Sequence, residues 1–212
     1  LNSYTVFCSH LFFAIFYYFY FSPRIYKQKI KIKAPDFLDK TMLSSISFIS
    51  AATLITAIIS PPNNWDSMSY HLSRIQHWIQ NNGVSFFDTN NFRQNLFSPF
   101  GEFIILHMQI LSNSDIFANL VQWFSLIICM STMSLICKEF GLSRRLQLFS
   151  AFFICSMPIV ILEASSTQND IILSAFFLLF YYYQLCSIKR PSQLNLIFSG
   201  VSLGLGVLTK GT

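Results

Sequence analysis

Charged residues are scarce in this sequence of 212 residues, because Asp, Glu, Lys and Arg together make up only 11% of it. Soluble domains carry about 25% charged residues. Here 53% of the residues are hydrophobic and 17% are aromatic. This composition excludes an ordinary soluble domain and predicts a membrane protein.

The sequence also lacks internal repeats, soluble-domain linkers and metal-ligand spacing. Its five cysteines lie inside apolar runs, without the paired spacing of a metal site. We therefore expect them to act as small apolar side chains in lipid or at helix interfaces, not as disulfides. No initial methionine is present, and we expect the sequence to be part of a longer protein.

What the chain does contain is a series of apolar runs. A helix needs about 20 apolar residues to cross a bilayer. We predict six spans, the last one incomplete, at residues 4–21, 42–60, 115–137, 146–162, 171–188 and 194–208. A signal peptide is the alternative for the first run, but a basic stretch follows it instead of a cleavage site. The predicted fold class is all-α, a polytopic transmembrane helix bundle.

One long polar segment, residues 61–114, separates the second span from the third. Pro61 and Pro62 end the preceding helix, because proline cannot continue one. Apolar residues recur at spacings of three and four over residues 67–80, and a further apolar stretch covers residues 99–111. Both are too short to span a bilayer, so we predict two interfacial helices.

The distribution of Lys and Arg predicts the orientation. Eleven of the 14 basic residues lie in the loops 24–40, 138–145 and 189–190. The other three, Arg74, Arg93 and Lys210, lie on the opposite side of the membrane. Basic loops stay in the cytoplasm, so residues 61–114 are predicted to face outward. The net charge of +5 therefore indicates topology and not a nucleic-acid partner.

Two acidic residues are candidates for catalysis. Asp66, Tyr70 and Arg74 are spaced by four residues and share one helix face. A partly desolvated carboxylate can accept the proton of an attacking hydroxyl. The alternative is that Asp66 only caps the helix, which is a common role of Asp. Asp170 begins a later helix on the same side, where the helix dipole also favours an acidic residue.

The three outward cations suit an anionic ligand such as a phosphate, although snorkelling beside lipid explains each of them equally well. His71 and His77 are six residues apart and do not share a helix face. We predict no metal ligands from this pattern, while a divalent cation is left open as a cofactor.

Several motifs together carry a family resemblance. They are WDSMSYHLSRIQHW at 65–78, NFRQ at 91–94, PFGEFIILHMQ at 99–109, NLVQW at 119–123, TQND at 167–170 and GVLTKGT at 206–212. Over residues 61–212 the chain resembles bacterial membrane glycosyltransferases related to the protein O-mannosyltransferase family. The resemblance implies the GT-C fold and a polyprenyl-phosphate-linked sugar as donor.

The resemblance also implies roles for individual residues. Asp66 matches the catalytic acidic residue of the first outer loop, and Asp170 matches a second acidic position. Arg74 and Lys210 are candidates for contact with the lipid phosphate. The complete set of expected substrate-binding residues is Tyr70, His71, Arg74, Arg93, Glu102 and Lys210.

The expected function is transfer of a hexose or pentose, with inversion, to a hydroxyl of a saccharide, lipid or protein. The expected location is the bacterial inner (plasma) membrane, among membrane lipids, with no nucleic acid involved. A non-enzymatic transporter or flippase for lipid-linked saccharides is the alternative. Transport pathways usually place charges inside the spans, and here the polar residues gather in one outer layer instead, which favours the transferase.

Overall fold

Helices account for the regular structure of this protein. The computed structural model describes residues 2–21 and 34–211, and within these ranges it has no strand. Of the described residues, 76% are helical, and the predicted all-α fold class is confirmed. The elements are α1 (Ser3–Phe21), α2 (Phe37–Ile59), the π-helix η2 (Ser67–His71), α3 (Leu72–Gln80), α4 (Arg93–Leu96), α5 (Phe100–Ser112), α6 (Leu120–Glu139), α7 (Arg144–Ser156), α8 (Pro158–Glu163), α9 (Asp170–Lys189) and α10 (Gln193–Thr209).

Among the described residues, three helices are long and apolar enough to cross a membrane: α2, α6 and α9. Only 11%, 44% and 22% of their apolar windows are buried inside the protein. So much exposed apolar surface is unfavourable in water and is suited to lipid. Helices α1 and α10 occupy the first and last predicted spans, whereas the predicted basic loop at residues 24–33 lies outside the described residues.

The predicted single span at residues 146–162 is two helices, α7 and α8. Pro158 is the first residue of α8, and Met157 before it is extended, with φ −67° and ψ 125°. Proline has no N–H to donate, and it disfavours helical geometry in the residue that precedes it. The break redirects the chain, and Glu163 at the end of α8 reaches the polar side of the bundle.

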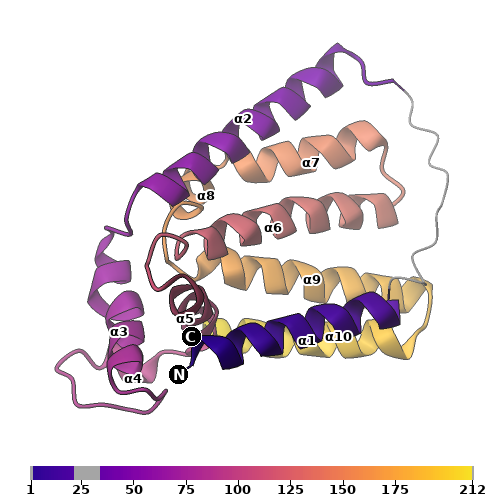
Figure 1. The fold of residues 1–212 in the computed structure, drawn as a ribbon. Helices are drawn as coiled ribbons and strands as arrows, with labels where there is room; N and C mark the ends of the chain where they lie inside the picture. The colour runs from indigo at the N-terminus through magenta and orange to yellow at the C-terminus, as the bar shows by residue number, and fades with distance from the viewer. Residues whose placement is uncertain (1, 22–33, 212) are drawn as a thin grey trace.

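The long helices stack in a row (Figure 1). Helix α9 packs against both α6 and α10, and α7 packs between α6 and α2. A buried cluster joins α6, α7 and α9; its members are Leu126, Cys129, Met130, Cys155, Ala164, Ile171 and Ala175. All five cysteines are free, and four of them are buried.

Exposed ion pairs connect the helix ends at one side of the bundle. Arg145 pairs with Asp36, and Arg190 pairs with Glu139. Asp36 also caps α2 by accepting a hydrogen bond of 2.9 Å from Asp39 N. Such surface pairs add about 0–1 kcal/mol of stability each. They show that the short basic loops gather at the same end of the molecule.

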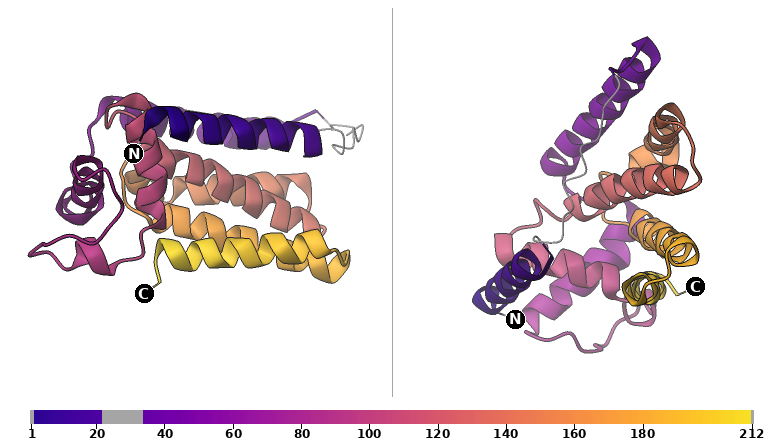
Figure 2. Two further views of the ribbon diagram at one scale, coloured as in Figure 1. Left: turned by 60° about the horizontal axis from the view of Figure 1, so that its bottom comes forward. Right: turned by 90° about the vertical axis from the view of Figure 1, so that its right-hand side faces the viewer.

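The opposite end, called the polar end below, is formed by η2, α3, α4, α5 and the loops beside them (Figure 1). Helix α5 runs crosswise to the long helices (left view of Figure 2). Its apolar side chains meet the apolar face of α3 and the starts of α6 and α9 in a second buried cluster: Leu72, Ile75, Trp78, Ile105, Leu106, Ala118, Val121 and Ile172. The first loop is therefore a packed layer over the end of the bundle.

Candidate functional site

Asp66 lies immediately before η2, and its side chain makes no capping hydrogen bond. Instead, Asn64 Oδ1 accepts a hydrogen bond of 2.7 Å from Ser67 N. Asn64 therefore satisfies the backbone donor that a cap residue would satisfy. The capping alternative for Asp66 is excluded, and its carboxylate is available for another role.

Tyr70 is the partner of Asp66, four residues further along. The Asp66 carboxylate lies near enough to the Tyr70 hydroxyl to raise its pKa by charge and by hydrogen bonding. Burial, the largest cause, together with the charge and hydrogen bonding of Asp66 raises the pKa of Tyr70 to about 12. Tyr70 therefore remains protonated at neutral pH and keeps the Asp66 carboxylate in place. The short π-helix η2, which contains Tyr70, is a feature often found at functional sites.

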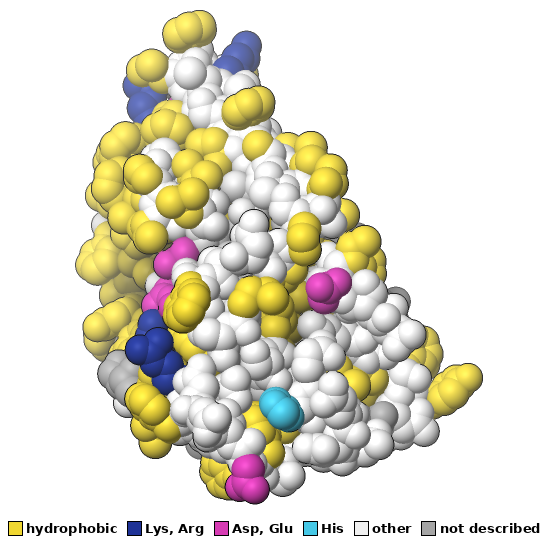
Figure 3. All heavy atoms as spheres, turned by 90° about the vertical axis from the view of Figure 1, so that its left-hand side faces the viewer, with side chains coloured by type: hydrophobic (Ala, Val, Ile, Leu, Met, Phe, Trp, Pro, Cys, Tyr) yellow, Lys and Arg dark blue, Asp and Glu magenta, His cyan; other side chains and the backbone are white. Residues whose placement is uncertain are grey.

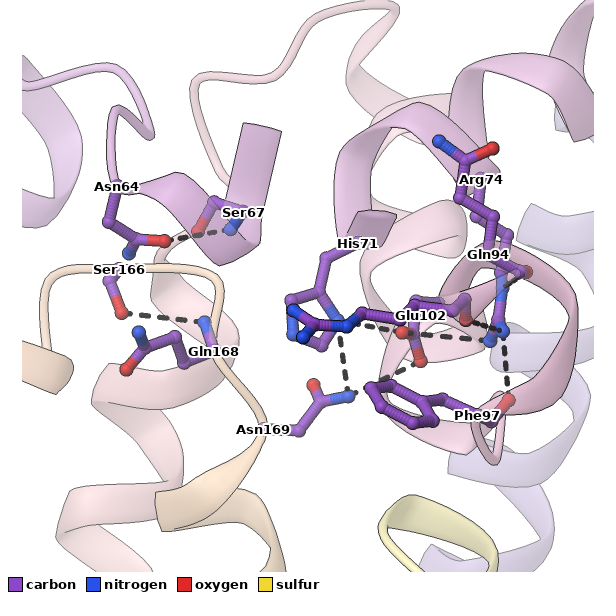
Figure 4. A network of polar contacts seen from close by, with 11 residues as sticks. Asn64, Ser67, His71, Arg74, Gln94, Phe97, Glu102, Ser166, Gln168 and Asn169 are labelled. Carbon is purple, nitrogen blue, oxygen red and sulfur yellow. Dashed lines mark hydrogen bonds and ion pairs between the residues drawn. The ribbon is translucent and has the colours of Figure 1, made fainter. Parts of the chain in front are cut away.

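A buried polar cluster lies beside this pair and joins three chain segments (Figure 4). Glu102, which is 0% exposed, lies at its centre. Its Oε1 is 2.7 Å from His71 Nδ1 and 3.7 Å from Arg74 Nη1, and its Oε2 accepts a hydrogen bond of 3.3 Å from Asn169 Nδ2. A buried carboxylate is stable only with such partners. The bond to Glu102 requires a proton on His71 Nδ1, which leaves Nε2 as the acceptor of the neutral ring.

Arg74 does not have the exposed position expected of a phosphate ligand, because it is 1% exposed. Its Nε donates to the carbonyl oxygen of Gln94. Its Nη2 donates to the carbonyl oxygens of Arg93 and Phe97, at 3.1 and 2.8 Å. Burial lowers the pKa of Arg74 and the charge of Glu102 opposes this shift. Arg74 thus holds the segment 93–97 against α3, and its positive charge balances the buried Glu102 carboxylate.

A narrow pocket of about 30 Å³ opens beside Tyr70 and His71. Its lining comes from the first loop, the start of α9 and the end of α10: Tyr70, His71, Phe97, Ser98, Asn169, Asp170, Thr209, Lys210 and Gly211. On one wall, Lys210 Nζ forms an ion pair of 2.7 Å with Asp170 Oδ1. The fold therefore brings four of the predicted site residues to one pocket.

The other predicted residues, Asp66, Arg74, Arg93 and Glu102, do not line this pocket. Arg93 is exposed, and its Cζ lies 6.0 Å from the centre of the Tyr70 ring. Glu102 is behind the pocket and reaches it only through His71 and Asn169.

Burial and the charge of Asp170 raise the pKa of Glu163, whereas Lys210 lowers it. At one edge of the polar end, acidic and basic side chains lie together on the surface (Figure 3).

Asn169 and Thr209 line the pocket but were not predicted as site residues. Asn169 is 4% exposed, and its Nδ2 lies 3.4 Å from His71 Nδ1 as well as near Glu102. Both residues are next to predicted ones, Asp170 and Lys210, within the motifs TQND and GVLTKGT. That adjacency is the signal that could have identified them.

Gly101 allows α5 to approach the Asn169 side chain. A Cβ at position 101 would lie 2.3 Å from Asn169 Oδ1. We expect Gly101→Ala to lower the free energy of unfolding by about 1–3 kcal/mol, because the core has no room for the methyl group. Thermal unfolding in detergent measures this loss. Gly204→Ala is the matched control, since nothing lies within 4 Å of its Cβ; equal losses in the two variants would contradict the packing described.

Residues that could hold a metal ion do not form a compact group. Across residues 2–21 and 34–211, no three His, Cys, Asp or Glu side chains come close enough together to hold a metal ion. The charges of Glu163 and Asp170 interact, and of these two acidic residues only Asp170 lines the pocket. Lys210 already pairs with Asp170.

Comparison with known proteins points to the same part of the chain. Residues 98–212, which are more than half of the sequence, match the family described as dolichyl-phosphate-mannose-protein mannosyltransferase. No curated protein and no solved structure matches the chain. The matched range contains Glu102, Asn169, Asp170 and Lys210, whereas Asp66, Tyr70, His71 and Arg74 precede it. The chain therefore belongs to the dolichyl-phosphate-mannose-protein mannosyltransferase family, which consists of membrane glycosyltransferases of the GT-C type.

Proposed function

We propose that this protein transfers a sugar from a polyprenyl-phosphate donor to an acceptor hydroxyl on the outer face of the membrane. The observation that supports this most is the pocket itself. It is lined by Tyr70 from the first loop and by the Asp170–Lys210 pair from two later helices, and Asp66 interacts with Tyr70 but does not itself line the pocket. Through Tyr70, a carboxylate that can accept a proton is thus linked to a pocket whose cation can bind a phosphate.

In the proposed reaction, the acceptor hydroxyl oxygen attacks the anomeric carbon of the donor sugar. The bond between that carbon and the phosphate oxygen breaks, and the phosphate keeps the electron pair. Asp66 accepts the hydroxyl proton as general base. Lys210 stabilises the charge that develops on the phosphate. A single displacement of this kind inverts the anomeric centre, and the transferred sugar is a hexose or a pentose.

An apolar groove supports the assignment of a lipid-linked donor. It has a volume of about 610 Å³, and α6, α7, α8 and α9 contribute its lining residues, among them Met157, Val160 and Phe177. Asp170 belongs both to this groove and to the narrow pocket. A polyprenyl chain in the groove would bring its phosphate to Asp170 and Lys210. Because the pocket holds only about 30 Å³, the sugar ring is placed at its mouth.

Glu102 is assigned a positioning role in place of the expected substrate contact. It is fully buried and bonds to His71 Nδ1. This bond keeps the proton on Nδ1 and orients the ring, and His71 lines the pocket. His71 Nε2 is then available to accept a hydrogen bond from a sugar or acceptor hydroxyl.

The outer-face assignment rests on the positions of the basic residues. The loops at residues 138–145 and 189–190 lie at the end of the bundle away from the pocket, where Arg145 and Arg190 form their ion pairs. By the positive-inside rule, that end is cytoplasmic and the polar end is outside. We place the protein in the plasma membrane, the inner membrane in a bacterium.

Sugar transfer is tested with purified full-length protein in detergent. A polyprenyl-phosphate sugar is supplied with acceptors that carry saccharide, lipid or peptide hydroxyl groups, and released polyprenyl phosphate is measured. Transfer needs no sealed compartment, whereas transport does, so product formed in detergent separates the two functions. Absence of product with every donor and acceptor, from protein that is folded, would contradict the proposed function.

Lys210→Met is expected to raise the KM for the lipid-phosphate donor by about tenfold to a hundredfold, because a charge-assisted contact to the phosphate is lost. Initial rates at varied donor concentration measure this change. Lys189→Met is the matched control, since Lys189 is an exposed lysine at the other end of the bundle. A normal KM in Lys210→Met would remove Lys210 from the donor site.

A further inference from the structure

A second polar cavity lies at the far end of α5, between α3, α5 and the start of α1. Its volume is about 380 Å³, within the range of small-molecule sites. The lining residues are Ser3, Gln76, Ile79, Gln109, Ile110, Asn113, Ser114 and Asp115. None of them belongs to the pocket beside Tyr70, so the proposed transfer reaction leaves this cavity without a role.

Gln109 gives the cavity a buried hydrogen-bond donor without a partner. The residue is 4% exposed, and its Oε1 accepts a hydrogen bond of 3.1 Å from Gln76 Nε2. This bond fixes the orientation of the Gln109 amide. Its Nε2 then has no hydrogen-bond partner in the protein. A buried donor in this state is unfavourable, and it is ready to bind an oxygen atom of a ligand.

The remaining lining groups define the chemistry of that ligand. Asp115 is exposed at the rim and supplies a carboxylate acceptor, and Asn113 and Ser114 add neutral polar groups. None of the described residues that line the cavity is Lys or Arg, so an anionic ligand has no counter-charge there. A hydroxyl group can accept from Gln109 Nε2 and also donate to Asp115. Ile79 and Ile110 offer apolar surface for the C–H groups of a ring.

The cavity is at the same end of the bundle as the transfer pocket. Gly101, at the start of α5, adjoins the cluster behind that pocket, and Ile110 near its end lines the cavity. A helix of 13 residues is about 20 Å long, and α5 runs crosswise over the ends of the long helices (Figure 2). A ligand bound in the cavity could therefore extend along the polar end toward the pocket.

We propose that this cavity binds a neutral saccharide, a remote sugar unit of the acceptor, at the opposite end of α5 from the transfer pocket. The saccharide class rests partly on the proposed glycosyl transfer, whereas the site itself rests on the partnerless Gln109 amide and on a polar lining that has no Lys or Arg. Recognition of a sugar unit at this position would select extended acceptors over single sugars.

Saturation-transfer NMR of the full-length protein in detergent tests the site directly. The probes are mannose, glucose, galactose, N-acetylglucosamine and their short oligomers, with glycerol as the reference polyol. No donor lipid is added, so binding is observed without transfer. We expect at least one sugar to show more saturation transfer than glycerol. Signals no stronger than that of glycerol for every sugar would mean that the cavity holds water only, and would overturn the proposal.

Two variants locate the binding. Gln109→Leu removes the buried donor, and Asp115→Ala removes the rim acceptor; each is expected to weaken sugar binding by about tenfold. Gln80→Leu is the matched control, because Gln80 is exposed on α3 and does not line the cavity. Unchanged binding in both variants would overturn the assignment. If Gln109→Leu does not fold, sugar binding by Asp115→Ala protein tests the proposal by itself, because Asp115 is exposed.

The outcome is independent of the proposed reaction. Sugar binding that depends on Gln109 in a protein without transferase activity would contradict the proposed reaction but support the proposed saccharide site. Active transfer by a protein that binds no sugar at Gln109 would contradict the saccharide site but support the reaction.

Discussion

Asp66→Asn protein is expected to transfer sugar with a kcat reduced by a factor of about 10²–10⁴, the usual contribution of a general base. The amide has nearly the same shape as the carboxylate but cannot take a proton from the acceptor hydroxyl. It can still accept a hydrogen bond from the Tyr70 hydroxyl, so the local structure is expected to persist. Initial rates at saturating donor measure the effect.

Asp88→Asn is the control for Asp66→Asn, because Asp88 is an exposed aspartate of the same loop and is not among the groups that shift the pKa of Tyr70. We expect it to retain normal activity. The pKa of Tyr70 offers a readout without substrate: it should fall in Asp66→Asn protein, since Asp66 contributes to its rise, and should stay above 10 because burial is the larger cause. Full activity in folded Asp66→Asn protein would disprove the assigned role.

Arg74→Met is expected to lower the free energy of unfolding by about 3–5 kcal/mol, the usual result of removing one partner of a buried ion pair. The change leaves the Glu102 carboxylate buried without its nearby cation. It also leaves three carbonyl oxygens, those of Arg93, Gln94 and Phe97, without their donor. Equilibrium unfolding of the purified protein in detergent measures the loss.

Arg93→Met is the matched control, because Arg93 is an exposed arginine of the same loop. Its unfolding free energy is expected to change by less than about 0.5 kcal/mol, as for most surface substitutions. Adding Glu102→Gln to Arg74→Met should restore part of the stability, since the uncompensated charge is then gone. A loss below about 1 kcal/mol in Arg74→Met would show that Arg74 is not the structural partner described here.

The sequence by itself determined the helices and their class. Apolar runs and proline positions are local features, and they predicted helices where α2, α6, α9 and α10 lie. Alternation of the loops also predicted that Asp170 and Lys210 would share a side with the first loop, and the structure brings these two residues together with Tyr70 and His71 in one pocket. Periodicity and chain order are sufficient for such statements because each helix must carry the chain from one end of the bundle to the other.

The tertiary structure alone decided what each polar side chain does. Arg74 and Glu102 were expected at the substrate, but packing of α3 on α5 buries both of them. Asn64, and not Asp66, provides the side-chain cap at the start of η2. Asn169 joins the cluster only because Gly101 leaves room for it. Hydrogen-bond partners and burial depend on residues distant in the sequence, so local patterns identified the polar end while three-dimensional packing separated its proposed catalytic carboxylate from its structural charges.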